Sequence, residues 1–238
     1  MSWRDAAPSG AAPDSGARLA VDGAGRAVFV HEAAAAALAS PAGACAGSLR
    51  SAAGGGAVRY AVWWRARADS SAALLAARSD DGGRSWGPPA AVDTLDGASL
   101  GCARPAPAIA ADSTNGYVHV AYFLVAPEGA GVFFAHSMER GAMFHAPVVI
   151  VFGERPAAVS VAARGDTVAV AYEDPNGVAR GIGLALSVTL GHIFERRLPL
   201  VSSPSVPATS PQVALGPRTV AVAWVERNEM VVRVGRLQ

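Results

Sequence analysis

The chain contains no lysine, so all twenty of its basic residues are arginine, and charged residues make up only 16% of its 238 positions. The formal net charge is +1, and no basic run is longer than a pair such as Arg196-Arg197. Nucleic-acid binding requires a basic patch or stripe, so the sequence predicts no nucleic-acid partner. The hydrophobic content of 51% is enough for a sizeable core and excludes extensive disorder.

Long apolar runs are also missing. No stretch reaches the roughly 18 residues of a transmembrane helix, so we expect no transmembrane segment. Residues 1–15 lack the basic region and apolar core of a signal peptide. Two interpretations stay open: a cytoplasmic protein, or a chain numbered after a removed export signal.

Metal-binding patterns are absent as well. The sequence has five histidines, and no two of them, nor any histidine and cysteine, stand at metal-ligand spacing. We therefore predict no metal site and no cofactor, and we assign core or surface roles to His31, His119, His136, His145 and His192.

One stretch organises the rest of the chain. Residues 79–86 read Ser-Asp-Asp-Gly-Gly-Arg-Ser-Trp, between an apolar run and the Pro-rich segment 87–89. An Asp followed by Gly between two extended segments predicts a hairpin turn, because the carboxylate accepts from nearby amides and Gly adopts positive φ. The pattern predicts a strand, a turn and a second strand.

This octapeptide resembles the Asp-box, or BNR repeat, of sialidases and their non-sialidase relatives, which are β-propellers. In that family the box is a structural turn on the rim, remote from the catalytic pocket. The resemblance implies structural roles for Ser79, Asp81, Gly83 and Trp86. It implies a fold more strongly than an activity.

Five strongly β-type runs recur along the chain, and a turn and a shorter apolar run precede each of them. We mark these runs by one valine each: Val30, Val62, Val120, Val170 and Val222. The spacing predicts an all-β fold built of repeated hairpins, in a single domain spanning residues 1–238.

The phase of the box supports the repeat. Ser79 follows the marker Val62 by a fixed number of residues. At the same interval after Val120 and Val170 stand Ser137 and Ser187. Both serines open degenerate boxes that keep a Gly and a terminal aromatic, while Glu139 and Thr189 replace the Asp. The predicted structural residues of these two boxes are Ser137, Gly141, Phe144, Ser187, Gly191 and Phe194.

The same interval from Val222 would fall just past Gln238, and Ser2-Trp3 resembles the end of a box. We therefore expect a β-propeller of five blades, each with up to four antiparallel strands. The strand after Trp3 is expected to pair with residues 230–237 and close the ring. On this interpretation the chain is a complete ring and not an arbitrary fragment.

The first unit departs from the pattern. Val30 and Val62 stand closer together than any other two neighbouring markers, and the helix-favouring run Ala33–Ala37 stands where a box is expected. We expect a reduced first blade. A four-bladed ring with an extra hairpin and a six-bladed ring stay open.

Candidate site residues lie at the face opposite the boxes, called the top. Arg104 and Arg155 precede inner strands and loosely echo the arginines with which sialidases hold a substrate carboxylate. Capping a loop or pairing with Glu154 is the competing role for them. For a sialidase-like enzyme the remaining candidates are Tyr172, Glu173 and Glu226, although adjacent Tyr172 and Glu173 should point to opposite faces of a strand.

The two cysteines occupy equivalent places. Cys45 precedes Val62 by almost the same interval as Cys102 precedes Val120, so both lie before the first strand of neighbouring units. A disulfide between them would fit an oxidising compartment, and two free thiols are the alternative.

Two functions follow from these features. The first is a non-catalytic binding or scaffolding propeller whose top face takes a protein or glycan, or which is a subunit of a larger assembly. Short loops favour it, because they leave little material for a deep pocket. The alternative is an exo-sialidase-type glycoside hydrolase acting on terminal acidic sugars. The family resemblance also favours a bacterial, exported protein.

Overall fold

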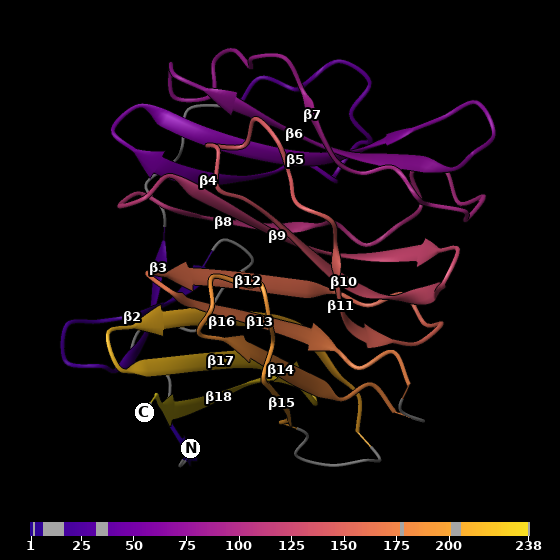
Figure 1. The fold of residues 1–238 in the computed structure, drawn as a ribbon. Helices are drawn as coiled ribbons and strands as arrows, with labels where there is room; N and C mark the ends of the chain where they lie inside the picture. Colours follow the sequence, from indigo (N-terminus) through magenta and orange to yellow (C-terminus); the bar gives the residue numbers. More distant parts are fainter. Residues whose placement is uncertain (2, 7–16, 32–37, 177–178, 201–205, 238) are drawn as a thin grey trace.

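The structure is a computed structural model that describes residues 1, 3–6, 17–31, 38–176, 179–200 and 206–237. Every regular element among them is a β-strand, and none is a helix (Figure 1). The run Ala33–Ala37, for which the sequence favours a helix, lies outside the described residues. An all-β fold is confirmed for the described part of the chain.

The strands form five antiparallel sheets, which we call units one to five. Unit one contains β2 (Ala17–Val21) and β3 (Ala27–His31). Unit two contains β4 (Arg50–Gly55), β5 (Val58–Ala66), β6 (Ala72–Ser79) and β7 (Ala90–Asp93). Unit three contains β8 (Ala108–Asp112), β9 (Tyr117–Ala126), β10 (Gly129–Ser137) and β11 (Val148–Phe152). Unit four contains β12 (Val159–Arg164), β13 (Thr167–Glu173), β14 (Ile182–Ser187) and β15 (Arg196–Pro199). Unit five contains β16 (Ala208–Gly216), β17 (Thr219–Glu226), β18 (Glu229–Arg236) and β1 (Trp3–Asp5).

The five marker valines all fall on the second strand of a unit, opposite the first strand. Val30 pairs with Arg18, Val62 with Arg50, and Val222 with Val213. The markers of units three and four pair in the same way. The repeat read from the sequence therefore corresponds to one sheet per marker.

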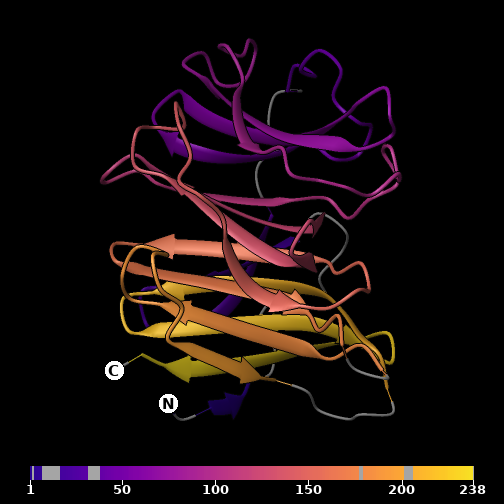
Figure 2. The same ribbon diagram turned by 45° about the vertical axis from the view of Figure 1, so that its right-hand side comes forward.

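The N-terminal strand completes the last unit. Trp3 of β1 pairs with Gly235 of β18, and Asp5 with Arg233, as the sequence predicts. The Asp5 carboxylate also accepts a hydrogen bond of 2.8 Å from Nε of Arg233. Figure 2 shows β1 beside the C-terminal strands, so the two ends of the chain share one sheet. Unit one has two described strands where the other units have four, in agreement with the expected reduced first unit.

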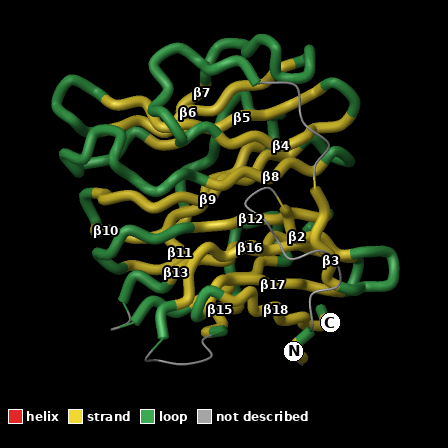
Figure 3. The backbone as a smooth tube through the Cα atoms, turned by 180° about the vertical axis from the view of Figure 1, so that it is seen from behind, coloured by secondary structure: helices red, strands yellow, loops and turns green. Residues whose placement is uncertain are grey.

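The first strands of the units, which we call inner strands, lie side by side. β4 contacts β8, β8 contacts β12, β12 contacts β16, and β16 contacts β2. In Figure 1 the sheets follow one another from β4–β7 at the top to β16–β18 at the bottom, with β2 and β3 alongside. Figure 3 shows from behind that β2 lies beside β16. The starts of all five inner strands therefore face one region.

The core lies between the sheets. Second and third strands read as nearly continuous apolar runs because both of their faces are covered. On unit two, the face with Trp63 and Leu75 packs against Ala44 and Leu49, from the segment that precedes β4. The Trp86 indole donates to the carbonyl of Ala39 in the same segment. This segment therefore covers that face of unit two.

The octapeptide and its two degenerate copies form the same turn between the third and fourth strands. In each copy the serine hydroxyl accepts from the amide of the glycine four residues later, at 2.8 Å for Ser79, 3.0 Å for Ser137 and 3.1 Å for Ser187. All three serines are buried, so these bonds satisfy amides that water cannot reach. Each serine thus closes its turn with a hydrogen bond from the glycine amide.

The first copy adds a carboxylate to the turn. Asp81 accepts from the Ser85 hydroxyl at 2.6 Å and from the Ser85 amide at 3.0 Å, and Ser79 also donates to it. The bonds from Ser85 and then from Ser79 hold the pKa of Asp81 well below its usual range. Asp81 is thus a turn residue whose oxygens are occupied within the octapeptide.

Candidate functional site

The starts of the five inner strands enclose a cavity of about 720 Å³. Its walls come from β2, β4, β12 and β16 and from residues 105–109, which include the start of β8. The octapeptide turns follow third strands, which run parallel to first strands in an antiparallel meander, so they lie at the opposite end of the units. The cavity is therefore on the face predicted to be the functional one.

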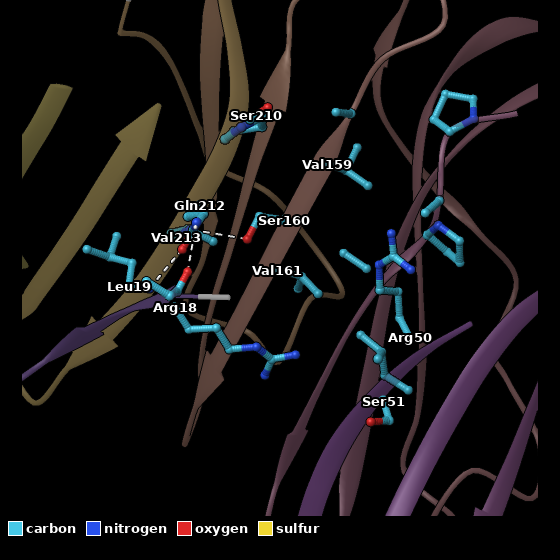
Figure 4. A pocket seen from close by; sticks show the side chains of 18 residues that line it. Arg18, Leu19, Arg50, Ser51, Val159, Ser160, Val161, Ser210, Gln212 and Val213 are labelled. Carbon is cyan, nitrogen blue, oxygen red and sulfur yellow. Dashed lines mark hydrogen bonds between the residues drawn. The ribbon is translucent and has the colours of Figure 1, made fainter. Parts of the chain in front are cut away.

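Two arginines face each other in this cavity. Arg18 projects from β2 and Arg50 from β4, and Figure 4 shows both side chains directed into the same space. Among the described residues that line the cavity, these are the only charged ones. Nη1 of Arg50 donates to the carbonyls of Gly47 and Leu49, each at 2.8 Å, which anchors that side chain to the segment before β4. Partial burial, and then the positive charge of Arg18, lower the pKa of Arg50. An anion between the two guanidinium groups would relieve this repulsion.

The remaining polar groups of the wall are neutral side chains. Ser51, Ser160, Ser210 and Gln212 line the cavity together with alanine, proline and valine side chains. No carboxylate and no tyrosine hydroxyl is among the described lining residues. The described part of the wall therefore offers hydrogen-bond donors and positive charge, and its described side chains include none of the carboxylates or tyrosines that serve as acid, base or nucleophile in glycoside hydrolysis.

Hydrogen bonds between neighbouring units hold the wall in place. The Trp64 indole of unit two donates to the Pro105 carbonyl at 2.9 Å, which fixes the segment leading into β8. Ser160 on β12 accepts from the Val213 amide on β16 at 3.1 Å. On β16, Gln212 accepts from the Leu19 amide of β2 at 2.8 Å. These bonds join unit two to unit three, unit four to unit five, and unit five to unit one.

The first predicted arginine has a structural role. Arg104 forms an ion pair of 2.8 Å with Asp96, and both side chains are almost fully buried. Its other nitrogens donate to the carbonyls of Gly101 and Ala98, and its guanidinium lies over the Trp64 ring. Arg104 does not line the cavity, because its donors are directed into its own loop.

The other four sialidase-type candidates are not brought together either. Arg155 is half-buried in the loop before β12 and does not line the cavity. Tyr172 packs between units three and four, whereas the adjacent Glu173 points toward unit five, as the alternation of a strand predicts. Glu226 accepts from the Trp224 indole at 3.3 Å at the end of β17.

Glu173 contacts the backbone of the cavity wall. Its carboxylate accepts from the amides of Ala158 and Ser210, two lining residues, and it forms an ion pair with Arg180. The side chain is almost completely buried. Glu173 therefore supports the wall from behind and joins unit four to unit five.

The two predicted cysteines form a disulfide. Cys45, before β4, is joined to Cys102, before β8. The bond closes a loop with a sequence separation of 57 residues and connects units two and three beside the cavity face. The alternative of two free thiols does not apply to this structure.

Four of the five histidines form a cluster, although they are scattered in the sequence. His136 stacks on His145 with ring centroids 4.7 Å apart, and it meets His192 edge-on at 4.5 Å and His119 at 6.3 Å. Burial lowers the pKa of His119 and of His136 to about 4. No group of three or more potential metal ligands among the described residues could hold a metal ion.

Sequence reasoning missed Arg18, Arg50 and Gln212. A signal for the arginines exists, since Arg18 precedes its marker Val30 by the same interval as Arg50 precedes Val62. Without the sheet register, that coincidence cannot be told from two exposed arginines on separate loops. For Gln212 no local signal exists, because its partner Leu19 is 193 positions away.

Comparisons with known proteins place the fold. No family model and no curated protein matches the chain. The chain is similar in structure to a Hadza microbial sialidase, with a TM-score of 0.55, 15% identity, and coverage of 79% of this chain and 44% of that one. A protein of unknown function from Dyadobacter fermentans gives a TM-score of 0.53 at 16% identity, with coverage of 76% and 50%. An α-L-arabinanase from Penicillium chrysogenum, in complex with arabinobiose, gives 0.52 at 13% identity, with coverage of 78% and 60%.

These likenesses show a fold of the β-propeller kind. At such low identity they show the fold alone, and this chain spans about half the length of the proteins it resembles. No described helix has the length and apolar character needed to cross a membrane.

Proposed function

We propose that residues 1–238 form one sialidase-like propeller of five blades, closed as a ring, that binds an acidic glycan in its top-face cavity without cleaving it. The three serine-glycine turns are its Asp-boxes, with the second and third degenerate. The disulfide between Cys45 and Cys102 fits an exported protein, because such bonds persist in oxidising compartments.

The observation that carries this proposal is the chemistry of the cavity wall. Arg18 and Arg50 supply two guanidinium groups, which are suited to planar anions such as a sugar carboxylate. The wall's serine and glutamine side chains can donate hydrogen bonds to sugar hydroxyls. The volume of about 720 Å³ lies within the range of small-molecule sites.

Calorimetric titration tests the binding. N-acetylneuraminic acid and glucuronic acid are compared with their methyl esters, which keep the sugar and remove the charge. We expect the acids to bind, and Arg18→Met or Arg50→Met to weaken that binding by about tenfold or more, since each removes charge-assisted hydrogen bonds.

Arg84→Met is the matched control for loss of an arginine. Arg84 is exposed on the octapeptide turn, at the opposite end of unit two. This variant should bind the acids as the native chain does. Equal affinity for acid and ester, or no binding of either acid, would overturn the proposal.

A glycoside hydrolase is the second candidate, and the position of Glu173 favours it. This carboxylate lies against the amides of two lining residues, so a shift of the bulge at Ser210 would bring it toward the cavity. Release of 4-methylumbelliferone from its sialoside measures this activity. Turnover by the native chain that is abolished in Glu173→Gln, with the melting temperature preserved, would establish the enzyme and displace the binding role.

A further inference from the structure

We propose that Gln212 is a positioning residue of the cavity, which holds the backbone on both sides of Arg18 so that its guanidinium faces Arg50. This inference rests on the proposed anion-binding role of the cavity. It concerns how one arginine is kept in place, and it can be tested separately from the identity of the ligand.

Gln212 brackets Arg18 with one side-chain amide. Its Oε1 accepts from the Leu19 amide at 2.8 Å, and its Nε2 donates to the Ala17 carbonyl at 3.4 Å. These two backbone groups stand immediately after and immediately before Arg18. The pair of bonds links β16 to β2, and it clamps β2 at the residue that enters the cavity.

Unit one needs such a clamp more than the other units do. The inner strand β4 belongs to a sheet of four strands, whereas β2 has only β3 beside it among the described strands. Two-stranded sheets are marginal by themselves, so their geometry depends on their neighbours. The main contact partners of β2 outside its own sheet, among the described strands, are β16 and β17 of unit five.

The direction of Gln212 is set by a bulge. The register of β16 against β17 shifts between Thr209 and Gln212, and Ser210 within the bulge has a positive φ of 56°. Bulges re-aim the side chains that follow them. The bulge is itself held by Glu173, which accepts from the Ser210 amide at 3.2 Å. A continuous series of contacts thus runs from Glu173 through Gln212 to the backbone of Arg18.

The test uses Gln212→Met, which keeps an unbranched side chain of similar length and removes both hydrogen bonds. We expect the Leu19 amide to exchange with solvent about tenfold faster, because it loses its acceptor. NMR order parameters of the Arg18 Nε–H should fall, while those of Arg50 stay unchanged. Binding of N-acetylneuraminic acid should weaken by about fivefold to tenfold, as expected for one misplaced guanidinium.

Arg197→Gln is the matched control for the loss of two bonds between units. Arg197 of β15 donates to the carbonyls of Ile150 and Val149 on β11, away from the cavity. This variant should leave Leu19 exchange and Arg18 order unchanged.

The outcomes separate the two proposals. If the native chain binds no acid, the binding role fails. The exchange rate of the Leu19 amide and the order parameter of the Arg18 Nε–H then still decide the role of Gln212. If the acid binds and Gln212→Met leaves Arg18 order and affinity as they were, the positioning role is wrong and the binding role stands.

Discussion

Stability toward acid should depend on His119. Its side chain is fully buried on β9, and neither ring nitrogen has a hydrogen-bond partner among the described protein atoms. Burial and the neighbouring His136 lower its pKa to about 4 from the ordinary value of 6.5, and Asp112 opposes this shift only in part. The folded chain therefore holds His119 neutral, whereas the unfolded chain protonates it near pH 6.5.

The sign and size of the effect follow from this difference. Because the folded-state pKa is the lower one, the stability is fully present above about pH 7 and is lost as the pH falls from about 6.5 to about 4. The difference between the two pKa values corresponds to about 3 kcal/mol at the acid limit, of which about 2 kcal/mol is lost by about pH 5.

Urea unfolding of the native chain and of His119→Leu, at several pH values between about 7.5 and 5, measures the effect. The variant removes the titrating group and the two unsatisfied nitrogens, so its stability at neutral pH should be equal or higher. Between about pH 7.5 and pH 5, His119→Leu should lose about 2 kcal/mol less unfolding free energy than the native chain. His31→Gln, at an exposed histidine outside the cluster, should keep the native profile. Parallel profiles for the native chain and His119→Leu would refute the reasoning.

Four further variants test the turns, the loop and the disulfide by thermal or urea unfolding. Ser187→Ala should destabilise the folded chain by about 1–3 kcal/mol, because the buried Gly191 amide loses its acceptor. Leu190→Gly should stabilise it by up to about 1 kcal/mol, because Leu190 has a positive φ of 61°. An unchanged Ser187→Ala or a destabilised Leu190→Gly would contradict the turn geometry. Arg104→Ala should cost about 3–5 kcal/mol, since it leaves Asp96 buried without its partner, and acid binding should persist in protein that stays folded. Replacing Cys45 and Cys102 together by serine should cost about 2–4 kcal/mol, and no loss would mean that closing this loop contributes nothing to folding.

The sheets could be predicted from the sequence because their signals are local. The marker valines lie in apolar runs whose period and turns can be read from their immediate neighbours, and all five fall on second strands. The serine turns could be found from their constant spacing to the marker valines, even where another residue replaces the aspartate. The reason is that the hydrogen bond between the serine hydroxyl and the glycine amide defines the turn. In Thr189 the hydroxyl replaces the carboxylate, accepting from the Ile193 amide at 3.0 Å.

The site could not be predicted, because its contacts are not local. The arginines chosen from the sequence stand beside prolines in loops. Arg104 forms its ion pair with Asp96, an earlier residue of the same loop. The Arg-Pro pattern does not reveal this pairing. The histidine cluster escaped for the same reason. His119 and His136 are paired across neighbouring strands, while His192 reaches them from the next unit.

The charged side chains of the cavity come from two units. Arg18 belongs to unit one, which has the fewest described strands, and Arg50 belongs to unit two. The inner strands pack in a row from β4 through β8, β12 and β16 to β2. Among the described strands, β2 and β4 at the two ends of this row do not share such extensive contact. Arg18 and Arg50 stand on the two strands at the ends of that row, so among the described strands their repulsion acts between two strands that do not share this extensive contact. An anion held by both arginines would then supply an attractive link between units one and two. Ligand binding is therefore expected to stabilise the folded arrangement of units one and two, since a ligand that binds only the folded form stabilises it by mass action.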